Sequence, residues 1–135
     1  MVSVVILFIS VVLTMFYKWE ITYKIIWCAM KVHKELWCWF QEVIYQRALL
    51  IELGKEWLVF EREKTMEVMY KGRKIGTRRV DFLVDEDVMV ELKAITKIEE
   101  VNKAQLMNYI EAYGVRIGLL INFWTKELEY YRFIK

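Results

Sequence analysis

Proline is absent from this chain of 135 residues, and glycine occurs only 5 times. Average usage would give a chain of this length about seven Pro and about nine Gly, and collagen-like and low-complexity proteins are excluded. The 2 cysteines, Cys28 and Cys38, are too few for a disulfide scaffold or a cysteine metal site, which favours a reducing, cytoplasmic environment. The net charge of +2 indicates no strong attraction to nucleic acid or membranes by itself.

Apolar and aromatic side chains are abundant instead. Hydrophobic residues make up 57% of the chain and aromatic residues 16%, including 6 Trp. This content excludes a disordered chain and is ample for one hydrophobic core. Because no linker or internal repeat interrupts the pattern, we expect a hydrophobic leader over residues 1–18 and a single domain over residues 19–135.

The leader carries no charged side chain from residue 1 to residue 17. Its length of about 17 residues is the lower limit for a membrane-spanning helix. A signal peptide is not indicated, because a basic start and a small-residue cleavage site are missing. Three interpretations stay open: a membrane anchor that leaves Lys18 and the following residues in the cytoplasm, a buried strand or helix, or an over-extended start in a protein that begins at Met15.

Two helices are predicted after the leader. Apolar residues recur at helical spacing over 19–36 and again over 41–53, where Gly54 is expected to end the helix. The segment between them, Trp37-Cys38-Trp39, contains no turn-forming residue. It is therefore either the middle of one long helix or a hairpin with unsuitable residues.

The remainder of the chain alternates between strand and helix patterns. The helix over 99–113 is expected to end at Gly114, with an apolar stripe of Val101, Ala104, Met107 (or Leu106) and Ile110. Strands are predicted on either side of it, at 58–70, 74–84, 88–95, 115–122 and 127–134. The chain therefore belongs to the α/β class.

One predicted hairpin contains candidate metal-binding and catalytic residues. A turn at Asp85–Asp87 places Asp81 directly opposite Glu91, and Lys93 lies on the same face because side chains alternate along a strand. Two adjacent carboxylates repel each other, and a divalent cation such as Mg²⁺ resolves the repulsion. The ammonium group of Lys93 could then orient or deprotonate a water molecule, which suits phosphodiester hydrolysis. The opposite face is expected to be apolar, with Val80, Phe82, Val84, Val88, Val90, Leu92 and Ala94.

The same charged residues have a simpler interpretation, in which Asp81, Glu91 and Lys93 form a solvated, charge-paired face of the sheet. Other polar residues are open to both views: Glu42 and Tyr45 on the second helix, and Gln105 and Tyr109 one turn apart on the helix over 99–113. A basic cluster on the strand before Asp81 could contact phosphates or face solvent, and consists of Arg73, Lys74, Arg78 and Arg79.

Taken together, these segments resemble the GxxExxY proteins, a branch of the PD-(D/E)XK nuclease superfamily. The resemblance runs from about Ile21 to Ile134 and rests on the order of several segments: YKIIWCAMKVHKEL, FQEVIYQRAL, FEREKTMEVMYKG, RVDFLVDEDVMVELKAI and NKAQLMNYIEAYGVRIGLLINF. It implies a restriction-endonuclease-like α/β core, in which a mixed central sheet is flanked by helices and preceded by two N-terminal helices. It also implies a metal-dependent nuclease, with DNA as the expected nucleic-acid substrate.

The resemblance assigns roles residue by residue. Asp81 and Glu91 would hold Mg²⁺ or Mn²⁺, with help from the Leu92 carbonyl, and Lys93 would be the catalytic lysine. Further catalytic positions would be Glu42, Gln105 and Tyr109, with Tyr45 as the family's Tyr and His33 as a candidate neighbour of the metal.

The alternative is a non-catalytic module that binds nucleic acid or another partner. That module would be tethered to a membrane if residues 1–17 span one. A homodimer is a further expected assembly.

Five tryptophans stand where the family pattern has glycine: Trp27, Trp37, Trp39, Trp57 and Trp124. Either a divergent member packs these indoles or uses them to extend its helices, or the gene uses UGA codons that its organism reads as glycine. The codons distinguish the two explanations, because UGG at these positions excludes the second.

Overall fold

The computed structural model describes residues 3–135 and confirms the predicted α/β class. The elements follow the expected order, and their bounds are α1 (Val4–Met15), α2 (Trp19–Leu36), α3 (Glu42–Lys55), β1 (Phe60–Tyr70), β2 (Arg73–Val84), β3 (Val88–Lys93), α4 (Glu100–Tyr113), β4 (Ile117–Asn122) and β5 (Glu129–Ile134). The strands form one mixed sheet in the order β1-β2-β3-β4-β5. Only β3 and β4 are parallel, and α4 makes the crossover between them.

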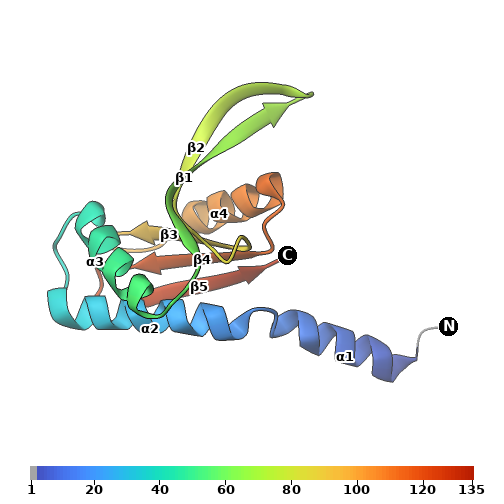
Figure 1. The fold of residues 1–135 in the computed structure, drawn as a ribbon, viewed down its shortest axis with the longest axis horizontal. Helices are drawn as coiled ribbons and strands as arrows, with labels where there is room; N and C mark the ends of the chain where they lie inside the picture. Colours follow the sequence, from blue (N-terminus) through green and yellow to red (C-terminus); the bar gives the residue numbers. More distant parts are fainter. Residues whose placement is uncertain (1–2) are drawn as a thin grey trace.

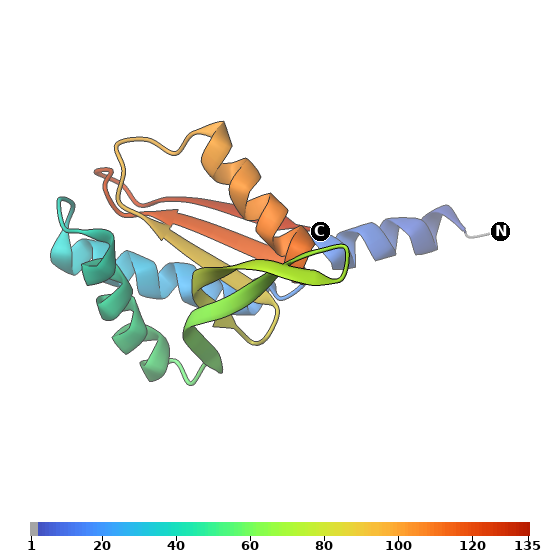
Figure 2. The same cartoon turned by 90° about the horizontal axis from the view of Figure 1, so that it is seen from above.

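Helices cover both faces of this sheet (Figures 1 and 2). On one face α2 and α3 pack against β2, β3 and β4, and Ile25, Tyr45 and Leu49 are completely buried there. On the other face α4 packs through Leu106 and Ile110. Because both faces are covered, β3 is buried from Val88 to Leu92 and β4 along its whole length, rather than at alternate residues.

The apolar stripe predicted for α4 is confirmed in part. Ile110 and Leu106, the alternative to Met107, are buried, whereas Val101, Ala104 and Met107 are exposed. The close approach of α4 to β4 explains the difference, since a Cβ at Gly118 would lie 3.0 Å from Cγ of Leu106. The glycine lets the helix approach β4 with the Leu106 side toward the sheet, which leaves the flanking apolar residues in solvent.

The register predicted for the central hairpin is confirmed. Phe82 pairs with Val90 and Val84 with Val88 across the turn at Asp85–Asp87. One member of the predicted apolar face differs, because Val80 is buried in the cluster beneath α4 rather than with Phe82 on the α2 face. The ladder between β2 and β3 ends at Phe82, where β2 turns away from the sheet and its side chains change surroundings.

β1 and β2 continue beyond the sheet as a two-stranded arm. They contain 11 and 12 residues, whereas β3 has 6, and the β2–β3 ladder extends only from Phe82 to Val84. β1 and β2 stay paired with each other out to Tyr70 and Arg73. Figure 1 shows this arm, residues 62–79, rising from the body beside α4.

α1 extends away from the body toward the N-terminus, at the right of Figure 1, and contributes no buried side chain. It joins α2 at a bend around Lys18, where φ is 50°. By length and composition, the helical stretch from Val4 to Leu36 is apolar enough to cross a membrane.

Three of the five unexpected tryptophans have backbones that favour glycine. Trp37 has φ 62° and ψ −161°, a combination essentially restricted to glycine, and Trp39 has φ 82°. These two residues break the chain between α2 and α3, so the single long helix is wrong. Trp57, with φ 58°, follows the C-cap Glu56, the position where helices favour a left-handed glycine.

The other two tryptophans have no such backbone. Trp27 lies inside α2, and neither Trp27 nor Trp124 has a positive φ. α3 also continues past Gly54 to Lys55, so the predicted helix end at that glycine is wrong, and Trp57 holds the left-handed position instead.

We expect Trp37→Gly, Trp39→Gly and Trp57→Gly each to raise the free energy of unfolding by about 1 kcal/mol, because a side chain in left-handed backbone costs about 1–2 kcal/mol. The three indoles are 63%, 78% and 93% exposed, so little apolar burial is lost. Trp27→Gly is the matched control, and should lower stability by about 1 kcal/mol because glycine disfavours helix interiors. Urea unfolding measures all four variants, and equal effects at helical and left-handed positions would contradict the expectation.

Candidate active site

The site forms where β2 separates from both of its neighbours. The β2–β3 ladder stops at Phe82↔Val90, one pair short of the expected pairing of Asp81 with Glu91. The β1–β2 ladder skips the facing residues Glu63 and Asp81, and Glu63 adopts a left-handed backbone with φ 53°. Asp81 therefore lies in a gap in the sheet, where its carboxylate can replace backbone groups as a hydrogen-bond partner.

Both carboxylate oxygens of Asp81 are held by hydrogen bonds. The backbone N–H of Leu92 donates to Oδ2 at 2.8 Å, and the side-chain amide of Gln46 donates to Oδ1 at 2.6 Å. Gln46 is itself buried and accepts a hydrogen bond of 2.9 Å from Nε of Arg62. These contacts fix the carboxylate between β2, β3 and α3.

Gln46 is a site residue that the sequence analysis missed. It lies four residues after Glu42 on α3, and residues at this spacing share one face of a helix. That spacing was the signal available in the sequence. Only the packing of α3 beside β2 shows which residue the amide holds.

Glu91 is nearly inaccessible to solvent, with 6% of its surface exposed. Its Oε1 is buried without a hydrogen-bond partner, and Oε2 lies 3.6 Å from a guanidinium nitrogen of Arg78. Burial, followed by the negative charge of Asp81, raises the pKa of Glu91 to about 7, against the opposing charges of Arg78 and Lys93. The alternative interpretation, in which Glu91 belongs to a solvated face of the sheet, is therefore wrong.

Glu42 and Lys93 complete a tight set of charges. Glu42 lies in the first turn of α3, and desolvation of its carboxylate together with the charge of Asp81 raises its pKa. The positive charge of Lys93 opposes this pKa rise, as it does for Glu91. Within residues 3–135, Lys93 takes part in no ion pair, which leaves its charge available to a ligand.

A polar pocket of about 230 Å³ opens over these groups, and its lining consists of Glu42, Gln46, Glu63, Arg78, Arg79, Val80, Asp81 and Glu91. Its lining combines three Glu and one Asp with two arginines, and Arg78 lies directly beside Glu91. Such a lining suits a cation together with an anionic ligand and does not suit an apolar molecule.

The donor set fits a hard divalent cation in part. Within residues 3–135, no group of three or more His, Cys, Asp or Glu side chains is arranged to hold a metal ion. Mg²⁺ is commonly held by one or two carboxylates, with water and substrate phosphate oxygens as its other ligands. The unpartnered Oε1 of Glu91 beside the fixed carboxylate of Asp81 meets this smaller requirement.

The Leu92 carbonyl is directed toward the same gap. The carbonyl of Lys93 accepts a hydrogen bond of 2.9 Å from the N–H of Phe123, next to β4. Successive carbonyls of a strand point to opposite sides, so the Leu92 carbonyl points toward β2 and Asp81. It could supply a third oxygen.

Two further predicted residues lie on α4, and their positions differ. Tyr109 lies beneath Arg78, with the guanidinium carbon 5.0 Å from the ring centroid. This contact helps to hold the arginine that faces Glu91. Gln105 is exposed, and its side chain forms no hydrogen bond within the described residues. The structure therefore brings Tyr109 to the rim of the site and leaves Gln105 outside it.

The predicted basic cluster is divided by the arm. Arg78 and Arg79 line the pocket, whereas Arg73 and Lys74 lie at the tip of the arm. A strand rises about 3.3 Å per residue, so about 17 Å of strand separates Arg73 from Arg78. The four residues do not form one patch.

His33 and Tyr45 have structural contacts away from the pocket. Nε2 of His33 lies 2.8 Å from the Thr125 carbonyl. The hydroxyl of Tyr45 donates to the Trp37 carbonyl at 2.7 Å, and its ring stacks on Phe123 with centroids 4.6 Å apart. His33 does not line the pocket, and Tyr45 stabilises the α2–α3 connection.

Residues 19–133 match the family model of the PD-(D/E)XK nuclease superfamily. No curated protein matches the chain. Among solved structures, the crystal structure of SSO0001 is similar, with a TM-score of 0.55 and 19% identity over 70% of this chain and 50% of that chain. The chain thus spans about half the length of SSO0001, and the likeness concerns the fold alone.

We expect the stability of the metal-free protein to depend on pH through Glu91. Its folded pKa of about 7 lies above the unfolded value of 4.5, so the folded chain retains the proton between these values. The resulting stabilisation is complete below pH 4.5 and is lost as the pH rises through 7. As the pH rises from 4.5 to 8, the free energy of unfolding of Glu91→Gln should increase by on the order of 3 kcal/mol relative to that of the native protein.

Urea unfolding in EDTA at several pH values measures this difference. Glu127→Gln is the matched control, because that side chain is exposed and far from the pocket lining. A Glu91→Gln difference that stays constant with pH would contradict the expectation.

Proposed function

The chain belongs to the PD-(D/E)XK nuclease superfamily, and on that premise we propose that it is a metal-dependent nuclease that hydrolyses phosphodiester bonds of DNA. The matching segments make the GxxExxY branch the proposed subfamily. The observation that carries the proposal is the buried, unpartnered Oε1 of Glu91 next to a fixed Asp81. A purely structural ion pair would leave no buried carboxylate oxygen without a partner.

Asp81, Glu91 and the Leu92 carbonyl are the proposed ligands of Mg²⁺ or Mn²⁺. Gln46 and the Leu92 N–H keep Asp81 in place, which is the preorganisation that a metal site requires. When bound, the cation would supply positive charge at the scissile phosphate and lower the pKa of a water molecule. It would also relieve the repulsion that raises the pKa of Glu91.

Lys93 is the proposed catalytic lysine. It lies on β3 two residues after Glu91 and forms no ion pair within residues 3–135, so its ammonium group could orient the attacking water or stabilise the charge that develops on the phosphate. Glu42 faces the same pocket from α3, and its raised pKa suits a group that accepts a proton from water. Arg78 and Arg79 are placed to contact phosphate oxygens, with Tyr109 as a positioning residue beneath Arg78. Among the proposed catalytic residues, Gln105 has the weakest support, because its side chain lies outside the pocket.

We expect Asp81→Ala and Lys93→Ala to reduce cleavage of a fluorescent DNA by at least 100-fold in Mn²⁺, while circular dichroism stays unchanged. Mn²⁺ should raise the melting temperature of the native protein and of Lys93→Ala, but not that of Asp81→Ala, because only the latter loses a proposed ligand.

Lys34→Ala, an exposed lysine on α2, is the matched control and should keep full cleavage and the full Mn²⁺ shift. Cleavage that survives in both site variants would refute the assignment. A native protein that shows neither cleavage nor an Asp81-dependent shift would favour the non-catalytic binding module. Size-exclusion chromatography with light scattering tests the expected homodimer.

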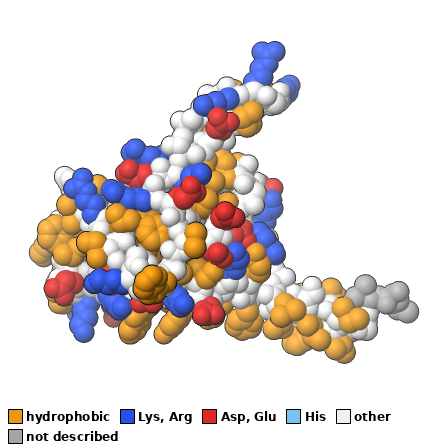
Figure 3. Space-filling view, in the orientation of Figure 1, with side chains coloured by type: hydrophobic (Ala, Val, Ile, Leu, Met, Phe, Trp, Pro, Cys, Tyr) orange, Lys and Arg blue, Asp and Glu red, His pale blue; other side chains and the backbone are white. Residues whose placement is uncertain are grey.

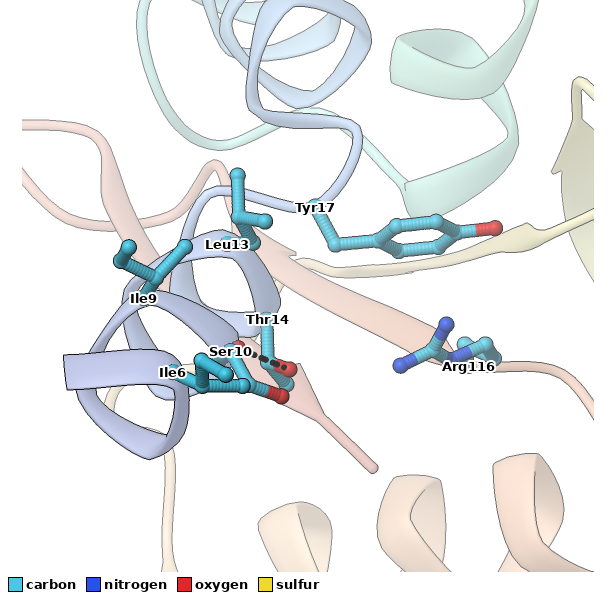
Figure 4. Close-up of a pocket in the computed structure, with 7 residues that line it drawn as sticks. All are labelled: Ile6, Ile9, Ser10, Leu13, Thr14, Tyr17 and Arg116. Carbon is cyan, nitrogen blue, oxygen red and sulfur yellow. Dashed lines mark hydrogen bonds between the residues drawn. The ribbon is translucent and has the colours of Figure 1, made fainter. Parts of the chain in front are cut away.

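A second candidate function, membrane tethering, is favoured by α1. Its large apolar residues are exposed all around the helix, from Val4 at 83% to Met15 at 59%, so no single face is reserved for a protein partner. Figure 4 shows Ile6, Ile9 and Leu13 of α1 lining a pocket together with Tyr17 and Arg116.

Contacts with the body hold the base of α1. The guanidinium of Arg132 donates to the carbonyls of Met15 and Tyr17, and the guanidinium of Arg116 lies 4.2 Å from the Tyr17 ring centroid. Tyr, Trp and basic residues are typical of a membrane interface, and they gather here as Tyr17, Lys18, Trp19, Arg116 and Arg132. The proposed location is cytoplasmic, with α1 inserted in the membrane.

We expect the full chain to float with vesicles that contain anionic lipid, and the double variant Leu7→Asp/Val11→Asp to stay in solution. Aspartate in the middle of a membrane helix costs about 2.5–3.5 kcal/mol. The same change at Tyr23 and Met30, exposed apolar residues of α2, is the matched control and should leave flotation unchanged. Equal flotation of the two double variants would exclude α1 as the tether.

A further inference from the structure

The arm differs from the rest of the molecule in its charge. Residues 62–79 contain 7 Lys and Arg but only 2 Asp and Glu, in a chain whose net charge is +2. The remaining residues together are therefore net negative. In Figure 3 the outer end of the arm, away from the mixed surface of the body, shows several basic side chains.

The outer part of the arm has no core of its own. Met69, Tyr70 and Ile75 are 52%, 59% and 65% exposed around the turn at Lys71–Gly72. An isolated two-stranded ribbon is marginally stable in water. Apolar and basic side chains at its tip therefore indicate contact with a partner that is both anionic and partly apolar.

We propose that this arm lies in the major groove of a DNA duplex whose scissile phosphate occupies the pocket, so that the substrate is double-stranded. The inference rests on the proposed nuclease function and adds the strandedness of the substrate. Arg78 and Arg79 link the two regions, because they belong to β2 of the arm and line the pocket.

The dimensions of the arm fit this groove. The major groove of B-DNA is about 12 Å wide and admits a two-stranded β-ribbon. The arm is such a ribbon, paired from Arg62↔Phe82 to Tyr70↔Arg73. About 17 Å of strand separates Arg78 from Arg73, which is about half of a helical turn of DNA. The tip can thus contact phosphates half a turn from the bond at the pocket.

Duplex RNA and single strands fit less well. The major groove of A-form RNA is deep and too narrow for side chains to read. Single-stranded DNA is usually bound by aromatic stacking in a basic groove, whereas the arm presents one exposed aromatic ring at its tip, Tyr70. Apolar tip residues such as Ile75 can contact thymine methyl groups, which line the major groove of a DNA duplex.

The first test is binding in EDTA, where metal-dependent cleavage is silent. A 30-base-pair DNA duplex, its single strand and an RNA duplex of the same sequence are titrated by fluorescence anisotropy from 50 to 200 mM salt. We expect the tightest binding to duplex DNA. In Arg73→Ala/Lys74→Ala the salt slope should fall by about 1.8, since each phosphate contact contributes about 0.9. The native protein should then lose about tenfold more affinity than the variant over this salt range.

Two matched variants separate charge from structure. Arg73→Lys/Lys74→Arg keeps both charges and should keep the salt slope. Lys24→Ala/Lys34→Ala removes two charges from α2, on the other face of the sheet, and should also keep the slope. The inference would be overturned if either of these two variants lost the salt slope, or if Arg73→Ala/Lys74→Ala kept it. It would also be overturned if the protein bound the single strand or duplex RNA as tightly as duplex DNA.

Hydrolysis of bis-p-nitrophenyl phosphate in Mn²⁺ tests the pocket without the arm. We expect Arg73→Ala/Lys74→Ala to hydrolyse this small diester like the native protein, while its cleavage of duplex DNA at 200 mM salt falls by about tenfold. Arm-dependent duplex binding without any hydrolysis would refute the nuclease function and leave only the contact between the arm and duplex DNA. Hydrolysis with arm-independent duplex binding would support the nuclease function and overturn the placement of the arm in the groove.

Discussion

The carboxylate of Asp81 lies in a gap of the sheet, and the rest of the site depends on how it is held there. In an ordinary ladder the N–H of Leu92 would bond to a backbone carbonyl of β2. Here it bonds to the side chain of Asp81, and Gln46 holds the second oxygen from α3. The exchange ends the β2–β3 ladder, lets β2 leave the sheet as an arm, and brings a helix, two strands and a fixed anion to one point.

Burial then determines how the charged side chains around Asp81 interact. Glu91 lies one residue beyond the end of the β2–β3 ladder and is paired with Leu120 of β4, where its buried carboxylate is subject to the charges of Asp81 and Glu42. Arg78 and Lys93 compensate part of this repulsion. Three carboxylates with two cations still leave one oxygen without a partner, and this unsatisfied group gives the site its capacity for a further cation.

Much of this arrangement followed from local sequence patterns. Alternation and the turn at Asp85–Asp87 predicted the facing of Asp81 and Glu91, because a hairpin register follows from its turn. Helical spacing predicted α2 and α3. In the α4 stripe, Ile110 and the alternative Leu106 were predicted correctly, whereas Val101 and Met107 are apolar but lie beside the contact that Gly118 allows.

The sequence by itself determined the order of the elements, the central hairpin, the family resemblance, and the oddity of a chain poor in glycine and rich in tryptophan. Tertiary structure decided which of those tryptophans occupy left-handed backbone, since φ depends on how α2 and α3 are joined. It decided that Gln46 holds Asp81 and that Gln105 stays outside. It also separated Arg73 from Arg78, because a strand that leaves its sheet carries its residues apart along its length.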